Sequence, residues 1–108
     1  MRRGDIRWYR FASPDKRRPV VILTHDSVIA YLGELTVAPI TSTIRDIPSE
    51  VLLSPLDGMP RDCAINLDHM QTVSKGRIGS LITTLSAEKL AQIRNGLLFA
   101  LGFDDLSR

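Results

Sequence analysis

The stretch that decides the fold is RRPVVILTHD, from Arg17 to Asp26, in which two arginines precede an uninterrupted apolar run. Pro19 fixes its own φ and disfavours a helical conformation at Arg18, so the chain is predicted to enter a strand here. We expect the strand to run from Pro19 to His25 and, because it lacks polar alternation, to be central and covered on both faces. Arg18 would then be held at the rim of a buried strand, with the fixed geometry that phosphate binding requires.

Shorter strand-like segments surround this one. Alternating side chains predict a half-buried strand over residues 4–10. Further strands are expected at Leu35 to Ile40, Glu50 to Leu53, Cys63 to Asp68 and Met70 to Val73. Pro39 cannot donate to a strand ladder and is expected to mark a bulge or a strand end. Residues 75–79 are predicted to form a basic, flexible connection.

From Ser86 onward the apolar period becomes helical. Ser86 is a candidate N-cap and Gly102 a candidate left-handed C-cap. Gly96 lies inside the helix and costs about 1 kcal/mol relative to alanine, which a close approach to the sheet would explain. The apolar stripe consists of Leu90, Ile93, Leu97, Leu98 and Leu101. Several short strands followed by one helix predict a mainly β fold, a small curled antiparallel sheet or barrel with the C-terminal α-helix packed on it.

The composition is that of a globular protein with one domain. The 108 residues are 44% hydrophobic and 24% charged, which argues against disorder. The single cysteine, Cys63, cannot form an internal disulfide, and this suits a reducing compartment. No apolar run approaches the ~20 residues that span a bilayer, and no signal-peptide pattern follows the N-terminal arginines. We therefore expect a cytoplasmic protein without a membrane partner.

Positive charge is concentrated at the N-terminal end. Seven basic residues fall within the first 18 positions, where only Asp5 and Asp15 oppose them. Such a surface attracts polyanions, and nucleic acid and an acidic protein tail are the two candidates. Trp8 and Tyr9 lie inside this segment and are able to stack on unpaired bases. An aromatic residue in a short strand more often belongs to the core, and we expect this of one of the pair.

Five segments occur in the order seen in one family of proteins. They are GDI at Gly4 to Ile6, RPVVIL at Arg18 to Leu23, VAPITS at Val37 to Ser42, INLDHMQTVSKGRI at Ile65 to Ile78, and a terminal helix ending in ALG. This order resembles the MazF/PemK toxins, the ribonuclease components of bacterial type II toxin–antitoxin pairs. The match extends over nearly the whole chain.

The resemblance implies an SH3-like barrel, a homodimer and cleavage of single-stranded RNA at a short sequence without metal or cofactor. The family's catalytic arginine corresponds to Arg18 and its catalytic threonine to Thr41. The implied partner is a cognate antitoxin with an acidic, disordered tail. The predicted RNA-binding residues are Ser42, beside the threonine, and the cations Lys16, Arg17 and Arg7.

The chemistry of these side chains indicates which residue stabilises charge in the reaction and which residues are candidates for the general base. Arg18 is always cationic, so it can stabilise charge on a phosphorane but cannot serve as the general base at neutral pH. Many family members carry a Gly-Ser-Glu-Gln stretch ahead of the arginine, which this chain lacks. Asp15 is the nearest carboxylate, and the histidines His25 and His69 are alternative acid–base groups. The general base is left open among them.

Two rival functions remain. One is a gyrase-binding toxin resembling CcdB on the same fold; such proteins use a terminal Trp-Gly-Ile, and the last residues of this chain, Asp104 to Arg108, contain no tryptophan. The other is an RNA-binding module without catalytic activity. RNA cleavage distinguishes the enzyme from both.

Overall fold

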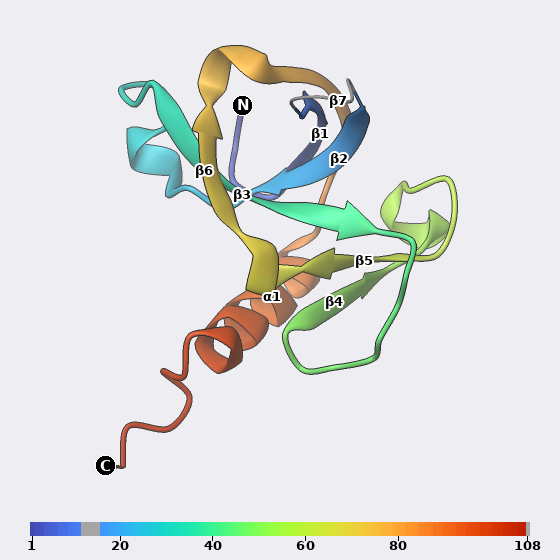
Figure 1. The fold of residues 1–108 in the computed structure, drawn as a ribbon, viewed down its shortest axis with the longest axis vertical. Helices are drawn as coiled ribbons and strands as arrows, with labels where there is room; N and C mark the ends of the chain where they lie inside the picture. Colours follow the sequence, from blue (N-terminus) through green and yellow to red (C-terminus); the bar gives the residue numbers. More distant parts are fainter. Residues whose placement is uncertain (12–15, 108) are drawn as a thin grey trace.

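One curled antiparallel sheet with a helix packed on it makes up the structure, a computed structural model that describes residues 1–11 and 16–107 (Figure 1). The strands are β1 (Asp5–Arg10), β2 (Arg17–Ile22), β3 (Glu34–Thr41), β4 (Glu50–Leu53), β5 (Cys63–Asn66), β6 (Gln71–Ser74) and β7 (Ile78–Thr84). The helix α1 spans Ala87–Ala100. Four short 3₁₀ helices connect the strands in the described part of the chain: η1 (Asp26–Val28), η2 (Pro55–Asp57), η3 (Leu67–His69) and η4 (Lys75–Arg77). The predicted fold class, mainly β with one C-terminal helix, is confirmed.

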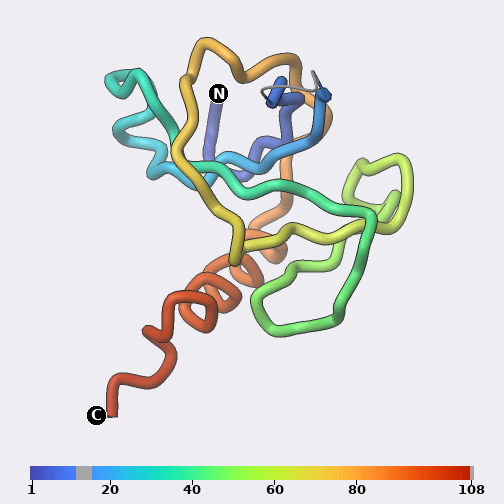
Figure 2. The backbone as a smooth tube through the Cα atoms, viewed as in Figure 1, coloured from blue at the N-terminus to red at the C-terminus, as the bar shows by residue number. Residues whose placement is uncertain are grey.

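The long strand β3 organises the sheet because it pairs along both edges. One edge pairs with β2, while the other pairs first with β6 and then with β5. The tube in Figure 2 follows β3 from the upper sheet to the β4–β5 hairpin. Pro39 is the last residue paired with β2 and lies where the other edge passes from β6 to β5. A residue without an N–H is tolerated at this change of partner. β3 continues to Thr41, so the prediction that the strand ends or bulges at Pro39 was wrong.

The buried strand β2 divides two apolar clusters. Val21 faces a cluster that includes residues of α1, whereas Val20 and Ile22 face a second cluster with Leu35 and Val73. All three β2 residues are fully buried. Consecutive side chains of a strand point to opposite faces, so this pattern confirms that β2 is central and covered on both sides.

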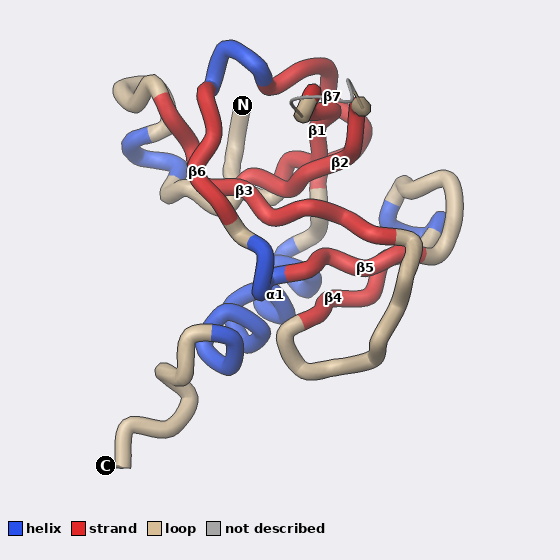
Figure 3. The backbone as a smooth tube through the Cα atoms, viewed as in Figure 1, coloured by secondary structure: helices blue, strands red, loops and turns tan. Residues whose placement is uncertain are grey.

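The structure confirms three features of the helix that the sequence predicted, at Ser86, Gly96 and Gly102. The Ser86 side chain accepts a hydrogen bond from the Lys89 N–H at 3.2 Å, and Gly102 has φ +78°. A Cβ on Gly96 would lie 2.5 Å from Cδ1 of the buried Leu67, so glycine permits the close approach of α1 to η3. Figure 3 shows the helix beside the β4–β5 hairpin, with the C-terminal segment extending away from the sheet.

Several predicted boundaries shift for local reasons. β2 ends at Ile22 rather than His25, because His25 caps η1. β5 ends at Asn66 rather than Asp68, because the Asn66 side chain accepts the Asp68 N–H at 3.1 Å and starts η3.

The segment after Ser74 was predicted as a flexible connection, and this was wrong. Residues 75–77 form η4, and β7, which the sequence did not predict, pairs with β1. Within the described residues, no helix is both long and apolar enough to cross a membrane.

Candidate functional site

A groove of about 430 Å³ opens where β2 begins and β3 ends. Its walls come from four parts of the chain: β1, the start of β2, the end of β3 with the residues after it, and the β4–β5 connection. The lining residues are Trp8, Arg17, Arg18, Pro19, Ile40, Thr41, Ser42, Thr43, Met59, Pro60, Arg61 and Cys63. We call this cavity the cationic groove, because its charged lining residues in the described part of the chain are arginines.

The β2–β3 pair brings Arg18 and Thr41 to the same groove. The antiparallel β2–β3 pairing ends at Val20 and Pro39. Arg18 and Thr41 each lie two residues beyond this last pair, and both line the groove. The Arg18 backbone is also paired with the core residue Tyr9 of β1. The Arg18 side chain is therefore exposed, while its backbone is fixed by pairing with a core strand.

The Thr41 hydroxyl is oriented by its own turn. Its Oγ1 accepts a hydrogen bond from the Thr43 N–H at 3.0 Å. A hydroxyl has one proton and two lone pairs, so this contact leaves the O–H of Thr41 available as a donor. The backbone of Thr41 is paired with Ala64 of β5. The side chain thus presents a donor to the groove from a fixed position.

Two further groove residues are Trp8, which the sequence marked as able to stack on bases, and Arg61, which the sequence did not single out. Trp8 lines the groove, and the Arg17 guanidinium lies over its ring at 4.7 Å from the centroid. Arg61 adds a third arginine from the β4–β5 connection. No local signal marks Arg61, because a turn between distant strands brings it to the groove. The expectation that one aromatic of the Trp8–Tyr9 pair is core is confirmed, since Tyr9 is buried.

The remaining predicted RNA-binding residues lie in different settings. Ser42 and Arg17 line the cationic groove. Arg7 does not; its Nη1 donates to the Gly79 carbonyl at 3.0 Å, and its Nε lies 3.8 Å from Asp5 Oδ2. Lys16 is exposed immediately before β2 but is not a lining residue.

The predicted acid–base groups are not gathered at the groove. His25 follows the far end of β2, where its Nδ1 lies 2.8 Å from Ser27 Oγ, and it borders a different cavity. His69 is exposed in η3, after β5. Asp15 lies outside the described residues. Among the described residues lining the groove there is neither a carboxylate nor an imidazole, so the geometry assigns no general base.

The Cys63 thiol lies in the groove wall and is 5% exposed. Burial, with smaller contributions from the negative charges of Asp62 and Asp57, raises the pKa of Cys63 above its usual value. The thiol therefore stays protonated at neutral pH and is a weak nucleophile.

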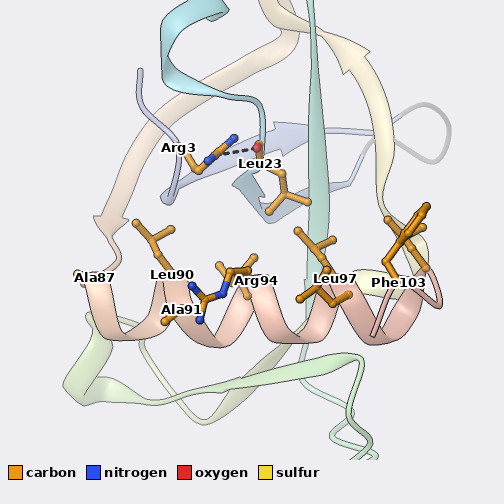
Figure 4. Close-up of a pocket in the computed structure, with 11 residues that line it drawn as sticks. Arg3, Leu23, Ala87, Leu90, Ala91, Arg94, Leu97 and Phe103 are labelled. Carbon is orange, nitrogen blue, oxygen red and sulfur yellow. Dashed lines mark hydrogen bonds between the residues drawn. The ribbon is translucent and has the colours of Figure 1, made fainter. Parts of the chain in front are cut away.

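A second cavity of about 550 Å³ follows the side of α1 and is largely apolar. Figure 4 shows Leu90 and Leu97 rising from the helix toward Leu23, and Arg3, whose Nε donates to the Leu23 carbonyl at 3.0 Å. We call it the helix-side cavity. Its Leu101 and Phe103 are more than half exposed. The cavity offers apolar surface and two rim arginines, Arg3 and Arg94, but no hydroxyl donor among its described lining residues.

Known proteins resemble this chain in sequence and in fold. The model of a family described as PemK-like, MazF-like toxin of type II toxin–antitoxin system matches residues 2–101. "Probable endoribonuclease MazF5" of Mycobacterium tuberculosis is 43% identical over 93 residues, which are 85% of this chain and 80% of that relative. "Endoribonuclease MazF3" of the same species is 36% identical over 84 residues, 78% of this chain and 82% of that relative.

The solved structures agree with the sequence relatives. The M. tuberculosis toxin MazF-mt6 superimposes with a TM-score of 0.84 at 30% identity, covering 91% of this chain and 96% of the other. The family model, the sequence relatives and the solved structure agree, and the chain therefore belongs to the family of PemK-like, MazF-like toxins of type II toxin–antitoxin systems.

Proposed function

We propose that the chain is a toxin endoribonuclease that cuts single-stranded RNA in the cationic groove, with Arg18 and Thr41 as its catalytic residues. The observation that carries this is that a cation at the start of β2 and a hydroxyl donor at the end of β3 line one groove, each on a paired strand end. The curated relatives named endoribonucleases support the reaction type. Arginine and hydroxyl donors are suited to the non-bridging oxygens of a phosphate.

The reaction proposed is an attack of RNA on itself. The ribose 2′-oxygen bonds to the adjacent phosphorus, the bond from phosphorus to the 5′-oxygen breaks, and the products carry a 2′,3′-cyclic phosphate and a 5′-hydroxyl. The 2′-proton leaves to a base, and the departing 5′-oxygen gains a proton. Arg18 stabilises the charge that grows on the phosphorane, and Thr41 donates to one of its oxygens. No covalent bond to the protein is formed.

The groove supplies positive charge through side chains. Enzymes that cleave phosphodiesters with metal ions bind those ions through carboxylate side chains. The described lining residues include three arginines and no carboxylate, a composition suited to binding the phosphate directly. We therefore propose that cleavage proceeds without a metal ion.

The same positive charge suits a protein partner. In a toxin–antitoxin system the toxin is neutralised by its cognate antitoxin, and an acidic, disordered tail would compete with RNA for Arg17, Arg18 and Arg61. We propose this mode of inhibition, together with a homodimeric assembly and a cytoplasmic location. Size-exclusion chromatography with light scattering checks the dimer.

Incubation of the purified protein with total RNA in EDTA tests the proposal. We expect new ends at a short common sequence, each pair consisting of a cyclic phosphate and a 5′-hydroxyl. Intact RNA that is only retarded in a gel would indicate the RNA-binding alternative. Cleavage that requires added Mg²⁺ would refute the metal-free reaction.

A further inference from the structure

We propose that Trp8 and Arg17 form a stacking platform that holds one unpaired nucleobase beside the phosphate bound at Arg18. This inference rests on the proposed function, because it names how the same groove takes hold of its RNA. It assigns Trp8 and Arg17 to base binding, whereas Arg18 and Thr41 act on the phosphate.

The positions of the two side chains carry the inference. Trp8 is partly exposed in the groove wall, although its neighbour Tyr9 is 6% exposed in the core. The Arg17 guanidinium lies 4.7 Å from the Trp8 ring centroid and lines the groove as well. An indole and a guanidinium are both flat groups on which a base can stack. Arg17 and Arg18 both line the groove, so the platform shares one cavity with the proposed phosphate site.

The backbone under Trp8 is fixed by an irregularity of the sheet. The β1–β7 pairing changes register between Arg7 and Tyr9, on either side of Trp8. A Cβ on Gly79 would lie 3.2 Å from the Trp8 carbonyl oxygen, so β7 packs closely against the Trp8 backbone. Arg7 donates to the Gly79 carbonyl at 3.0 Å and ties the two strands together there. Such irregularities commonly redirect a side chain next to a functional site.

The chemistry of the platform selects a particular ligand. A base in a duplex is already stacked on its neighbours, whereas a base in a single strand has a free face. The cation beside the aromatic ring favours a ligand that carries a phosphate next to its planar group. An unpaired nucleotide has both features, and an acidic peptide tail has only the charge.

Fluorescence provides a direct test, because Trp8 is the single tryptophan of the chain. The probe is a mixed-sequence oligonucleotide with 2′-deoxyribose throughout, which cannot cleave itself. We expect saturable quenching of Trp8 by this probe and little change with an abasic strand of equal length and charge. Equal responses to both strands, or no response to either, would overturn the inference.

Substitutions give an independent test. We expect Trp8→Ala and Arg17→Ala to raise KM for RNA cleavage about tenfold with a smaller change in kcat, since one stacked base contributes about 1–3 kcal/mol. Trp8→Phe should retain most of the affinity. Arg2→Ala removes one exposed cation from the same N-terminal segment and is the matched control for net charge.

The outcomes separate this inference from the proposed function. Cleavage with an unchanged KM in Trp8→Ala would refute the platform and leave the endoribonuclease intact. Equal effects of Arg17→Ala and Arg2→Ala would also refute it, because the effect would then come from overall charge. Quenching by an acidic peptide but not by the oligonucleotide would assign the platform to a protein partner and refute the base site.

Discussion

The cationic groove and the helix-side cavity lie in different parts of the fold and are built from different side chains. In the groove, exposed arginines and a hydroxyl are mounted on strand ends that pair with core strands. In the helix-side cavity, leucines follow one side of α1 and Phe103 lies beyond its end, and the charged residues among the described lining are Arg3 and Arg94.

The difference shows how one small core supports two kinds of surface. Polar groups that act on a phosphate need fixed geometry, which strand pairing gives to Arg18 and Thr41. Apolar groups need only to cover area, and a helix face provides this. We therefore expect changes in the groove to affect catalysis and changes around α1 to affect stability.

The largest effect is expected from Arg18→Ala. Loss of one charged donor to the phosphorane should lower kcat about 10²–10³-fold, while circular dichroism and Tm stay close to wild type. Arg94→Ala, which removes an arginine from the helix-side cavity, is the control and should retain activity. Wild-type cleavage rates in a folded Arg18→Ala protein would exclude the proposed site.

Gly96→Val tests the expected effect of changes around α1, at the face of the helix that packs on Leu67 rather than at the helix-side cavity. The added side chain would collide with Leu67, so we expect the free energy of unfolding to fall by about 1–3 kcal/mol. Urea unfolding measures this loss. The kcat per folded molecule should not change, since Gly96 does not line the groove. A selective loss of kcat would show that the two regions are not independent.

A smaller catalytic effect is expected from Thr41→Val. Removal of the hydroxyl should lower kcat about tenfold, less than the loss of Arg18, because a neutral donor is weaker than a charged one. Thr41→Ser keeps both the donor and the acceptor of the Thr43 N–H and should restore most of the rate. Single-turnover kinetics of the two variants measure the difference, and equal rates in both would argue against a role for the hydroxyl.

The smallest effect concerns the Cys63 thiol in the groove wall. Its raised pKa means that the thiolate forms at higher pH than in the unfolded chain, so alkylation at neutral pH should be slower in the folded protein. The protonated thiol favours the folded state below the unfolded pKa, and this contribution is lost as pH rises through the higher folded value. Iodoacetamide labelling across alkaline pH checks this, and faster labelling of the folded protein would contradict it.

The sequence predicted the elements that carry strong local signals. The apolar run after Pro19 identified the central strand, and Ser86 and Gly96 marked the start of α1 and its closest approach to the core. β7 escaped prediction because most of its side chains are exposed, so its residues show no apolar period. Arg18 was a candidate from its place before Pro19 and the buried strand, whereas Thr41 emerged only through a family resemblance, since its place beside the Arg18 site depends on the pairing of distant strands.

The rest of the site depends on contacts between distant segments. Arg61 reaches the groove through a turn, and Arg7, predicted to bind RNA, instead holds the β1–β7 pair. His25 and His69 are plausible acid–base groups by type, but neither lines the groove. A single sequence does not encode these distances in any local pattern.

The most direct test of RNA cleavage in the groove uses an oligonucleotide that contains one mapped cleavage site. The comparison strand carries 2′-deoxyribose only at the nucleotide before the scissile phosphate. We predict that the protein binds both strands with similar affinity and cuts only the strand with the 2′-hydroxyl. Cleavage of the deoxy strand at the same phosphate would contradict the account, because the attacking oxygen would then come from water or the protein.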